Sequence, residues 1–223
     1  MYVDLKYRIT TEDSVPVDHG YHLYAALSNL VPDLHQQNEI GIHSLRGKYL
    51  QNHHLKLRTG SSLVLRTPVE QIFQFLCLTG KTIQVNQAKI RIGVPQVTAL
   101  LAAPTLWSRL VIIKIAGQNA TQLDALSFRA SIEKQLSSYD VNPEGKVDIR
   151  KRRTLKIKDK VIVGYEVLLE NLTEEESLQV QIMGVGGRRH MGCGLFTAYR
   201  PRNKTMVTDM DETIGQGGYG IGK

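Results

Sequence analysis

The sequence predicts an α+β protein in which the element order β-α-β-β-α-β occurs twice in tandem. Stretches of alternating apolar and polar residues, typical of half-buried strands, are interleaved with stretches whose apolar residues recur at helical spacing. The same order of elements starts again after a short apolar segment that contains two prolines. Each half of the chain therefore matches the ferredoxin-like (RRM-like) arrangement.

The first unit covers residues 1–93, and local signals place its elements. Pro32 ends the first helix and Pro68 opens the second, because proline suits the first turn of a helix but not its interior. In chain order we expect a strand over Tyr2–Ile9, a helix over Tyr21–Val31, short strands over Ile40–His43, Lys48–Leu50 and Leu55–Leu57, a strand over Ser62–Arg66, a helix over Val69–Leu78 and a hairpin of Thr82–Val85 with Ala88–Ile92.

The second unit covers residues 108–200 and follows a packed linker, residues 94–107. Its last helix starts at a capping box, since Glu176 follows Thr173 by three residues. Residues 201–223 are polar and glycine-rich, which predicts a flexible tail. In chain order we expect a strand over Arg109–Ile115, a helix over Thr121–Tyr139, a hairpin of Val147–Ile157 with Val161–Leu168, a helix over Leu172–Met183 and a strand over Leu195–Tyr199.

Composition narrows the classes of protein to which this chain can belong. The 223 residues carry a formal net charge of +7, which suits an acidic partner. Two cysteines, Cys77 and Cys193, offer neither a disulfide framework nor a metal cluster and fit a reducing compartment. The segment MYVDLKYRIT lacks the apolar core of a signal peptide, and no stretch approaches the roughly 18 apolar residues of a membrane span. We therefore expect a cytoplasmic protein that does not contact membranes.

A glycine-rich stretch at residues 184–194, GVGGRRHMGCG, is the most distinctive part of the chain. Consecutive glycine N–H groups can form a concave anion nest, and arginine forks fit phosphate oxygens. The alternative is a turn that only reverses the chain. Helix, glycines and strand follow in the reverse order of a dinucleotide fingerprint, and the chain has no P-loop sequence. The residues expected to hold a phosphate here are Gly184, Gly186, Gly187, Arg188, Arg189 and Gly192.

Positive charge is concentrated in the predicted hairpin of the second unit. Residues 146–160 include eight basic and two acidic residues, a net charge of +6. Such a patch suits a phosphate backbone; the alternative is a solvated hairpin without a partner. The strand Arg109–Ile115 has no aromatic residue and the hairpin has only Tyr165, so we expect recognition of structured or duplex RNA through phosphates and shape. The hairpin residues expected to bind RNA are Arg150, Lys151, Arg152, Arg153 and Lys156.

The seven histidines are not spaced as metal ligands, so we expect no metal site. His35 follows the first helix in a polar loop, where a scaffold can position an exposed side chain that moves protons near neutral pH. His43, at the end of an apolar run, is the second candidate for this role. Arg46 and Lys48 follow closely in the sequence and could neutralise a phosphate.

Together these features resemble the CRISPR RNA repeat-processing endoribonucleases, the Cas-six family. The resemblance depends on two tandem ferredoxin-like units, a histidine after the first helix, a basic hairpin in the second unit and the glycine-rich loop near the C-terminus. The segments VDHGYHLYAAL, IGIHSLRG, SRLVIIK and RRTLKIKDKVIVGYEV are similar to one branch of the family. The resemblance extends over residues 1–200.

The resemblance implies metal-independent cleavage of a CRISPR repeat stem-loop, without a cofactor. A ribose 2′-OH attacks the adjacent phosphate, which leaves a 2′,3′-cyclic phosphate and a 5′-OH. His35 matches the position of the family's general acid/base histidine, with His43 as the second candidate. Arg46 or Lys48 could supply the cation that stabilises the phosphorane.

The first helix bears on whether the protein is an active endoribonuclease or a non-catalytic RNA-binding subunit. Some members carry a tyrosine on the first helix at the position that Ser28 occupies here, where Tyr21 or Tyr24 could substitute. An active enzyme of this kind implies a protein that keeps its product as a subunit of a Cascade-like CRISPR surveillance complex. The alternative is a non-catalytic RNA-binding subunit of such a complex.

Overall fold

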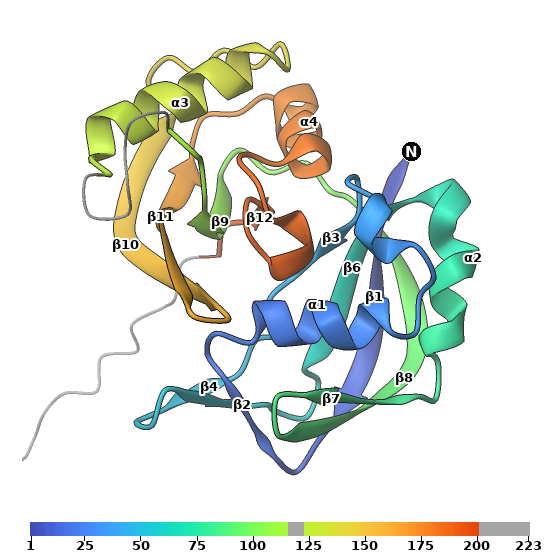
Figure 1. Cartoon of the computed structure of the whole chain (residues 1–223). Helices are drawn as coiled ribbons and strands as arrows, with labels where there is room; N and C mark the ends of the chain where they lie inside the picture. Colours follow the sequence, from blue (N-terminus) through green and yellow to red (C-terminus); the bar gives the residue numbers. More distant parts are fainter. Residues whose placement is uncertain (116–122, 201–223) are drawn as a thin grey trace, which may run out of the picture.

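The structure is a computed structural model that describes residues 1–115 and 123–200. Two α+β units lie side by side, each with an antiparallel sheet, helices packed on it and an apolar core of its own (Figure 1). Within the described residues, no helix is long and apolar enough to cross a bilayer. The predicted α+β class with two tandem ferredoxin-like units is confirmed.

The N-terminal unit has a five-stranded sheet with the order β3-β6-β1-β8-β7. Its first four members have the order of a ferredoxin-like sheet, and β7 is an added edge strand. A second sheet of three short strands, β2-β5-β4, lies beside it. The elements are β1 (Tyr2–Thr10), β2 (Ser14–Pro16), α1 (Gly20–Ser28), η1 (Leu34–Gln36), β3 (Gly41–Ile42), β4 (Lys48–Leu50), β5 (His54–Lys56), β6 (Ser62–Pro68), η2 (Val69–Gln71), α2 (Ile72–Phe75), η3 (Leu76–Leu78), β7 (Thr82–Val85) and β8 (Ala88–Ala99).

The C-terminal unit has a four-stranded sheet with the order β10-β11-β9-β12, again the ferredoxin-like order. The predicted capping box is confirmed, since Thr173 and Glu176 each accept a hydrogen bond from the other's backbone N–H. The elements are β9 (Leu106–Val111), α3 (Ala125–Ser137), β10 (Val147–Ile157), β11 (Lys160–Leu169), α4 (Glu174–Met183), η4 (Arg189–Met191) and β12 (Thr197–Ala198).

The helix predicted over Val69–Leu78 is divided into 3₁₀, α and 3₁₀ pieces. Within it only Phe75 and Leu78 are buried, whereas Phe73 and Leu76 are exposed. Two buried residues three positions apart suit the 3₁₀ repeat, in which such residues eclipse one another. The packing of the segment, which its composition does not encode, therefore favours the tighter helix.

The predicted linker at 94–107 is largely strand. β8 continues to Ala99 because β1 is long enough to pair with it along this stretch, and Pro95 lies opposite Tyr7. β7 pairs with β8 only as far as Arg91, so Pro95 lies where β8 is an edge strand and needs no N–H donor on that side. β9 begins at Leu106, three residues earlier than predicted, which adds Trp107 to the strand.

The predicted long helix of the second unit begins at Ala125. Its N-cap is Asp124, whose carboxylate accepts hydrogen bonds from the N–H groups of Leu126 and Ser127. The first two residues of that prediction, Thr121 and Gln122, lie outside the described residues. The predicted tail at residues 201–223 also lies outside them.

A buried arginine joins the two units. Arg66 on β6 is 1% exposed, and its Nε and Nη2 donate to the two carboxylate oxygens of Asp4 on β1 at 2.8 and 3.1 Å. Its Nη1 donates to the carbonyl oxygens of Gln181 and Phe196, both at 2.8 Å. Gln181 lies in α4 before the glycine-rich loop and Phe196 lies just after it. One guanidinium therefore attaches both ends of that loop to the N-terminal sheet.

The charge state of Asp4 follows from this contact. Burial raises the pKa of the carboxyl, but the hydrogen bonds and positive charge of Arg66 outweigh burial and hold the pKa below its ordinary value. Asp4 is therefore ionised in the folded protein, as a bidentate partner of a guanidinium should be.

We predict that Arg66→Ala destabilises the protein by about 3–5 kcal/mol, because it leaves a buried carboxylate uncompensated and two carbonyl groups without donors. The measurement is urea-induced unfolding of the full chain. Arg8→Ala, which removes an exposed arginine from the same sheet, serves as the control and should change stability by less than about 0.5 kcal/mol. Equal stability of the two variants would contradict the proposed role of Arg66.

Candidate functional site

The glycine-rich loop, residues 184–194, packs between α1 and the C-terminal sheet (Figure 1). Its backbone passes so close to both neighbours that a side chain would not fit. A Cβ atom on Gly186 would lie 2.3 Å from the carbonyl oxygen of Ile112, and Gly186 has a positive φ of 79°. On the other side, a Cβ atom on Gly20 of α1 would lie 2.4 Å from the carbonyl oxygen of Met191. Gly186 and Gly20 therefore permit close packing of the loop on its two neighbours, whereas Gly187 has open space around it.

The prediction of an anion nest is wrong for the four glycines named. The Gly186 N–H donates to the side-chain oxygen of Gln135 at 2.7 Å, and the Gly187 N–H donates to the carbonyl oxygen of Ile112 at 2.9 Å. The N–H groups of Gly184 and Gly192 donate to carbonyl oxygens three or four residues before them. The backbone N–H groups that would bind a phosphate thus donate to acceptors within the protein. The local sequence does not reveal these hydrogen bonds.

The two arginines of the loop point in different directions. Arg188 is exposed, in a left-handed conformation with φ 66°. Arg189 is turned inward: one of its nitrogens donates to the carbonyl oxygen of Met183, and its Nε and Nη2 are buried without a hydrogen-bond partner among the described residues. Burial is the main cause that lowers the pKa of Arg189. Arg188 is therefore the member of the pair that an RNA phosphate can reach directly.

His190, for which the sequence suggested no role, connects the loop to the segment after α1. Its ring stacks on Tyr24 of α1, with centroids 5.1 Å apart and planes within 8° of parallel. Its Nε2 lies 2.7 Å from the carbonyl oxygen of Gln37. Burial is the main cause that lowers the pKa of His190, so the ring is held neutral at pH 7.

His35 lies beside this contact, on the 3₁₀ turn η1. The side chain is exposed, while the preceding Leu34 is 1% exposed and anchors the turn in the core. His35 Nε2 is 3.4 Å from the side-chain nitrogen of Gln36. With Gln37 fixed by His190, an exposed imidazole is presented from a turn that is anchored on both sides.

Ser28 occupies the last position of α1, where the family resemblance places a tyrosine. Its hydroxyl donates to the carbonyl oxygen of Tyr24 at 2.9 Å and so bonds within the helix. Tyr24, one turn earlier, is the tyrosine that contacts the loop, through the ring of His190. Tyr24 therefore supports the glycine-rich loop instead of replacing a side chain at position 28.

His43 is buried, against the prediction of an accessible acid/base. Its side chain is 12% exposed, and its Nε2 lies 4.0 Å from Asp4 and has no hydrogen-bond partner among the described residues. Burial, with the charge of Arg66 next in size, lowers the pKa of His43 to about 3. A ring with so low a pKa is a weak base at neutral pH.

Arg46 and Lys48 lie away from His35. Arg46 reaches the C-terminal sheet, where it donates to the hydroxyl of Thr197 at 3.2 Å and lies 5.7 Å from the ring centre of Trp107. Lys48 is exposed on β4, in the small sheet β2-β5-β4. In this sheet β2 leads into the start of α1, whereas His35 follows the end of α1. The sequence places these cations close to His43, but the fold separates them from His35.

The described residues contain no group of three or more histidine, cysteine, aspartate or glutamate side chains that could hold a metal ion. His19, at the start of α1, is 2% exposed and is bonded to the Pro16 carbonyl oxygen and the Leu45 N–H, both at 2.8 Å. Burial lowers its pKa to about 4. This histidine is a neutral structural link.

The basic hairpin forms as predicted from β10 and β11, with a register shift between Ile149 and Arg152. Arg150 forms an ion pair with Asp148, and Arg153 forms one with Glu166 on β11. The other predicted RNA-binding residues of the hairpin, Lys151, Arg152 and Lys156, are exposed. Two of the basic residues, Arg152 and Arg153, line a cleft that residues of the N-terminal unit also line.

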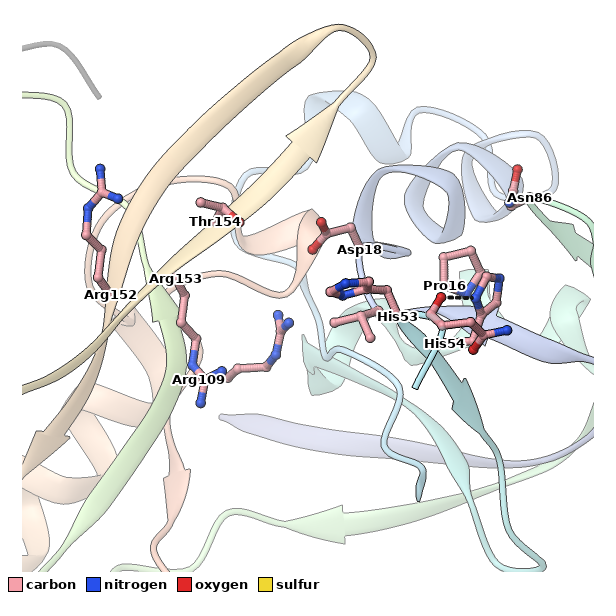
Figure 2. Close-up of a pocket in the computed structure, with 11 residues that line it drawn as sticks. Pro16, Asp18, His53, His54, Asn86, Arg109, Arg152, Arg153 and Thr154 are labelled. Carbon is pink, nitrogen blue, oxygen red and sulfur yellow. Dashed lines mark hydrogen bonds between the residues drawn. The ribbon is translucent and has the colours of Figure 1, made fainter. Parts of the chain in front are cut away.

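A cleft of about 530 Å³ separates this part of the hairpin from the N-terminal unit. Figure 2 shows Arg109, from β9, extending toward Asp18 and His53 of the N-terminal unit, with the Arg153 side chain of β10 ending beside Arg109. Asp18 is the one carboxylate that lines the cleft among the described residues. The lining residues are Pro16, Val17, Asp18, Asn52, His53, His54, Asn86, Arg109, Arg152, Arg153 and Thr154.

Comparison with known proteins identifies the family. The family model described as Cas6 Crispr matches residues 3–201. The CRISPR-associated endonuclease Cas6 of Myxococcus xanthus (strain DK1622) is 37% identical over 196 residues, which cover 88% of this chain and 81% of that protein. The chain belongs to the Cas6 family of CRISPR-associated endonucleases.

Solved structures agree with this assignment at the level of the fold. A CRISPR-associated protein Cas6 aligns with a TM-score of 0.66 and 14% identity, over 90% of this chain and 100% of that one. A Cas6-related protein from Pyrococcus furiosus aligns with a TM-score of 0.59 and 11% identity, over 88% of this chain and 98% of that one. The arrangement of the Cas6 fold is therefore preserved where little of the sequence is.

Sequence reasoning missed several residues of this candidate site. Arg66 looks like an ordinary strand residue, and Asp18 lies in a loop whose position no local signal gives. Trp107 and Arg109 lie two positions apart on β9. A strand predicted to start at Leu106 would have placed both side chains on the same face. Tyr24 was considered only as a substitute catalytic residue.

We predict that Gly186→Ala destabilises this Cas6 protein by more than about 1 kcal/mol, because the backbone has a positive φ and the added methyl would meet the Ile112 carbonyl. Urea unfolding measures the loss. The matched control is Gly187→Ala: Gly187 lacks a positive φ, and a Cβ there would have no neighbour within 4 Å. If both variants unfold at the same urea concentration, close packing of the loop is not what position 186 requires.

We also predict that stability falls with pH below neutrality. Histidine has a pKa of about 6.5 when unfolded, whereas His19 and His43 have pKa values of about 4 and about 3 when folded. Below pH 6.5 the unfolded state therefore binds protons that the folded state does not, and the free energy of unfolding decreases as pH falls toward 4. Urea unfolding from pH 7.5 to 4.5 measures this, with a slope of at most about 1.4 kcal/mol per pH unit for each histidine.

The control for this prediction is His43→Gln, which removes one titrating ring. Its stability should depend less steeply on pH over the same interval, by up to one proton. A wild-type protein equally stable at pH 7.5 and 4.5 would show that the buried histidines do not remain neutral.

Proposed function

We propose that this Cas6-family chain cleaves precursor CRISPR RNA within its repeat, without a metal ion, by attack of a ribose 2′-OH on the adjacent phosphate. The observation that supports the proposal is the exposed imidazole of His35 on an anchored turn next to the glycine-rich loop. Imidazole is the side chain best suited to move a proton at neutral pH. Anchoring on both sides gives it the fixed orientation that proton transfer needs.

The chemistry requires few groups. The 2′-oxygen loses its proton and bonds to phosphorus, while the bond from phosphorus to the 5′-oxygen breaks and that oxygen gains a proton. The products are a 2′,3′-cyclic phosphate and a 5′-OH. His35 takes the first proton or donates the second, and each such transfer contributes roughly 10²–10⁴ in rate.

Cations would hold the RNA around this point. Arg188 is exposed on the loop that packs beside η1, and the hairpin adds the exposed Lys151, Arg152 and Lys156. We propose that Arg46 and Lys48 contact phosphates away from the scissile bond, because neither lies next to His35. Contacts of this kind are sequence-independent and lose strength in salt.

A basic surface of this extent supports two further proposals. We infer that the protein keeps its cleaved RNA, and that the retained product links it to a Cascade-like CRISPR surveillance complex. A non-catalytic RNA-binding subunit is the second candidate function, and the bond of Ser28 to Tyr24 within α1 favours it, since position 28 then offers no side chain to the phosphate.

We predict that His35→Ala lowers the rate of repeat cleavage by roughly 10²–10⁴ and preserves affinity for the stem-loop, because only proton transfer is lost. The assay uses repeat RNA in EDTA under single-turnover conditions, with both product ends mapped. His22→Ala, which removes another exposed histidine, is the matched control and should cleave like the wild type.

Three results would change the interpretation. Unchanged cleavage by His35→Ala would remove His35 from the mechanism. Loss of cleavage in EDTA that is restored by a divalent cation would exclude the metal-independent route. Tight binding by the wild type without any cut would favour the RNA-holding subunit.

A further inference from the structure

One face of β9 carries an arginine that lines the cleft and a tryptophan beside it, which is linked to the cleft residue Arg153 through Glu166. Trp107 and Arg109 lie two positions apart on one strand, a spacing of about 7 Å along an extended chain. Leu106 and Ser108, which alternate with these two residues ahead of the register shift in the strand, are fully buried, and Leu106 belongs to the core under the helices, whereas Trp107 and Arg109 are only partly buried. Both therefore lie on the face that is turned away from α3 and α4.

Polar contacts fix the Trp107 ring at one edge. Its Nε1 donates to Glu166 Oε1 at 2.9 Å, and Glu166 Oε2 accepts from Arg153 Nε at 3.0 Å. The guanidinium of Arg46 lies over the ring, 5.7 Å from its centre, in the geometry of a cation–π contact. The ring is thus held in place, and what covers it is a flexible, partly exposed side chain from the other unit.

Arg109 provides the charge next to this ring. It projects into the 530 Å³ cleft with Arg153 (Figure 2), and its guanidinium makes no hydrogen bond to another described residue. The cleft wall carries Arg109, Arg152 and Arg153, whose three positive charges exceed the two negative charges of Asp18 across the cleft and of Glu166, the ion-pair partner of Arg153. Arg109 therefore offers unused donors that fit the oxygens of a phosphate, whereas Arg153, whose Nε and Nη2 donate to Glu166, adds its charge beside them.

We propose that this face binds one unpaired nucleotide of the RNA, with its phosphate between Arg109 and Arg153 and its base stacked on Trp107 in place of the Arg46 guanidinium. The proposal depends on the proposed function, in which RNA is the substrate. The cleft has a volume within the range of small-ligand sites, which is enough for the phosphate of one nucleotide. Unpaired bases are the ones that proteins stack on aromatic side chains and arginine planes.

When a base replaces Arg46 on the Trp107 ring, each contact that is lost is replaced by one of a similar type. Arg46 gives up a cation–π contact and its hydrogen bond to Thr197, and its released guanidinium can bind the phosphate of the incoming strand. The base regains the aromatic contact as a stacking interaction, which tolerates any base because each has a π-face. The site is therefore expected to select for an unpaired nucleotide and not for its identity.

Trp107 is the only tryptophan in the chain, so its fluorescence reports on this site alone. The experiment titrates the full-length protein with two RNAs: the repeat stem-loop with three unpaired nucleotides beside the stem, and the same stem-loop without them. We predict quenching of the fluorescence by the first RNA and little change with the second, although both bind.

Affinities test the same proposal. The ratio of affinities for the two RNAs should fall by about 5- to 150-fold in Trp107→Ala, the usual effect of losing one stacked base, and remain mostly intact in Trp107→Phe. Arg109→Ala should lower the salt dependence of binding for the flanked RNA only. Phe73→Ala removes an exposed ring on α2, far from the cleft, and is the matched control that keeps the wild-type ratio. Urea unfolding checks that each variant is folded.

The outcomes separate this proposal from the function on which it depends. If the wild type binds neither RNA, the proposed function fails. If it binds both RNAs but the fluorescence does not respond to the unpaired nucleotides, only the nucleotide site is overturned. A wild-type affinity ratio in folded Trp107→Ala would also overturn it.

Discussion

The arrangement of the two units depends on one buried guanidinium. Arg66 bonds to Asp4 within the N-terminal sheet and to the carbonyl groups of Gln181 and Phe196 in the other unit. A charge this deeply buried is tolerated only when its donors find partners, so the contact requires both units to be correctly placed. Because Gln181 and Phe196 flank the glycine-rich loop, the same requirement fixes that loop against η1. The geometry around His35 is in this sense a consequence of Arg66.

Burial divides the histidines into two groups with different chemistry. His19 and His43 are largely buried and their pKa values are lowered; His19 is a neutral link between Pro16 and Leu45, whereas the Nε2 of His43 has no hydrogen-bond partner among the described residues. His190 is intermediate: it stacks on Tyr24 and holds the backbone of Gln37. His35 remains exposed at the end of this chain of contacts. One imidazole, that of His190, thus holds the segment after the turn that presents another, that of His35, to solvent.

The charge of the chain is arranged around the space between the units. The basic hairpin supplies one wall of the cleft, and the segment that precedes α1 supplies the other, with Asp18 among its residues. Ion pairs such as that of Arg153 with Glu166 orient some of the cations. Arg109, by contrast, makes no hydrogen bond to another described residue. This distribution suits an extended anion that touches both units, and Trp107 gives the surface an aromatic contact as well.

The sequence by itself determined the order of elements, the capping box at Thr173 and Glu176, the basic hairpin and the family, because each depends on residues close together in the chain. Only the tertiary structure decided that Arg189 points inward, that the N–H groups of the loop glycines donate to other groups of the protein, and that His43 is largely buried. It also decided that Trp107 of β9 is only partly buried and lies under the guanidinium of Arg46. The physical reason is distance along the chain: His190 bonds to a residue 153 positions away, and Arg66 to one 130 positions away. Local propensity and spacing carry no information about such contacts, which exist only once both units are folded and packed.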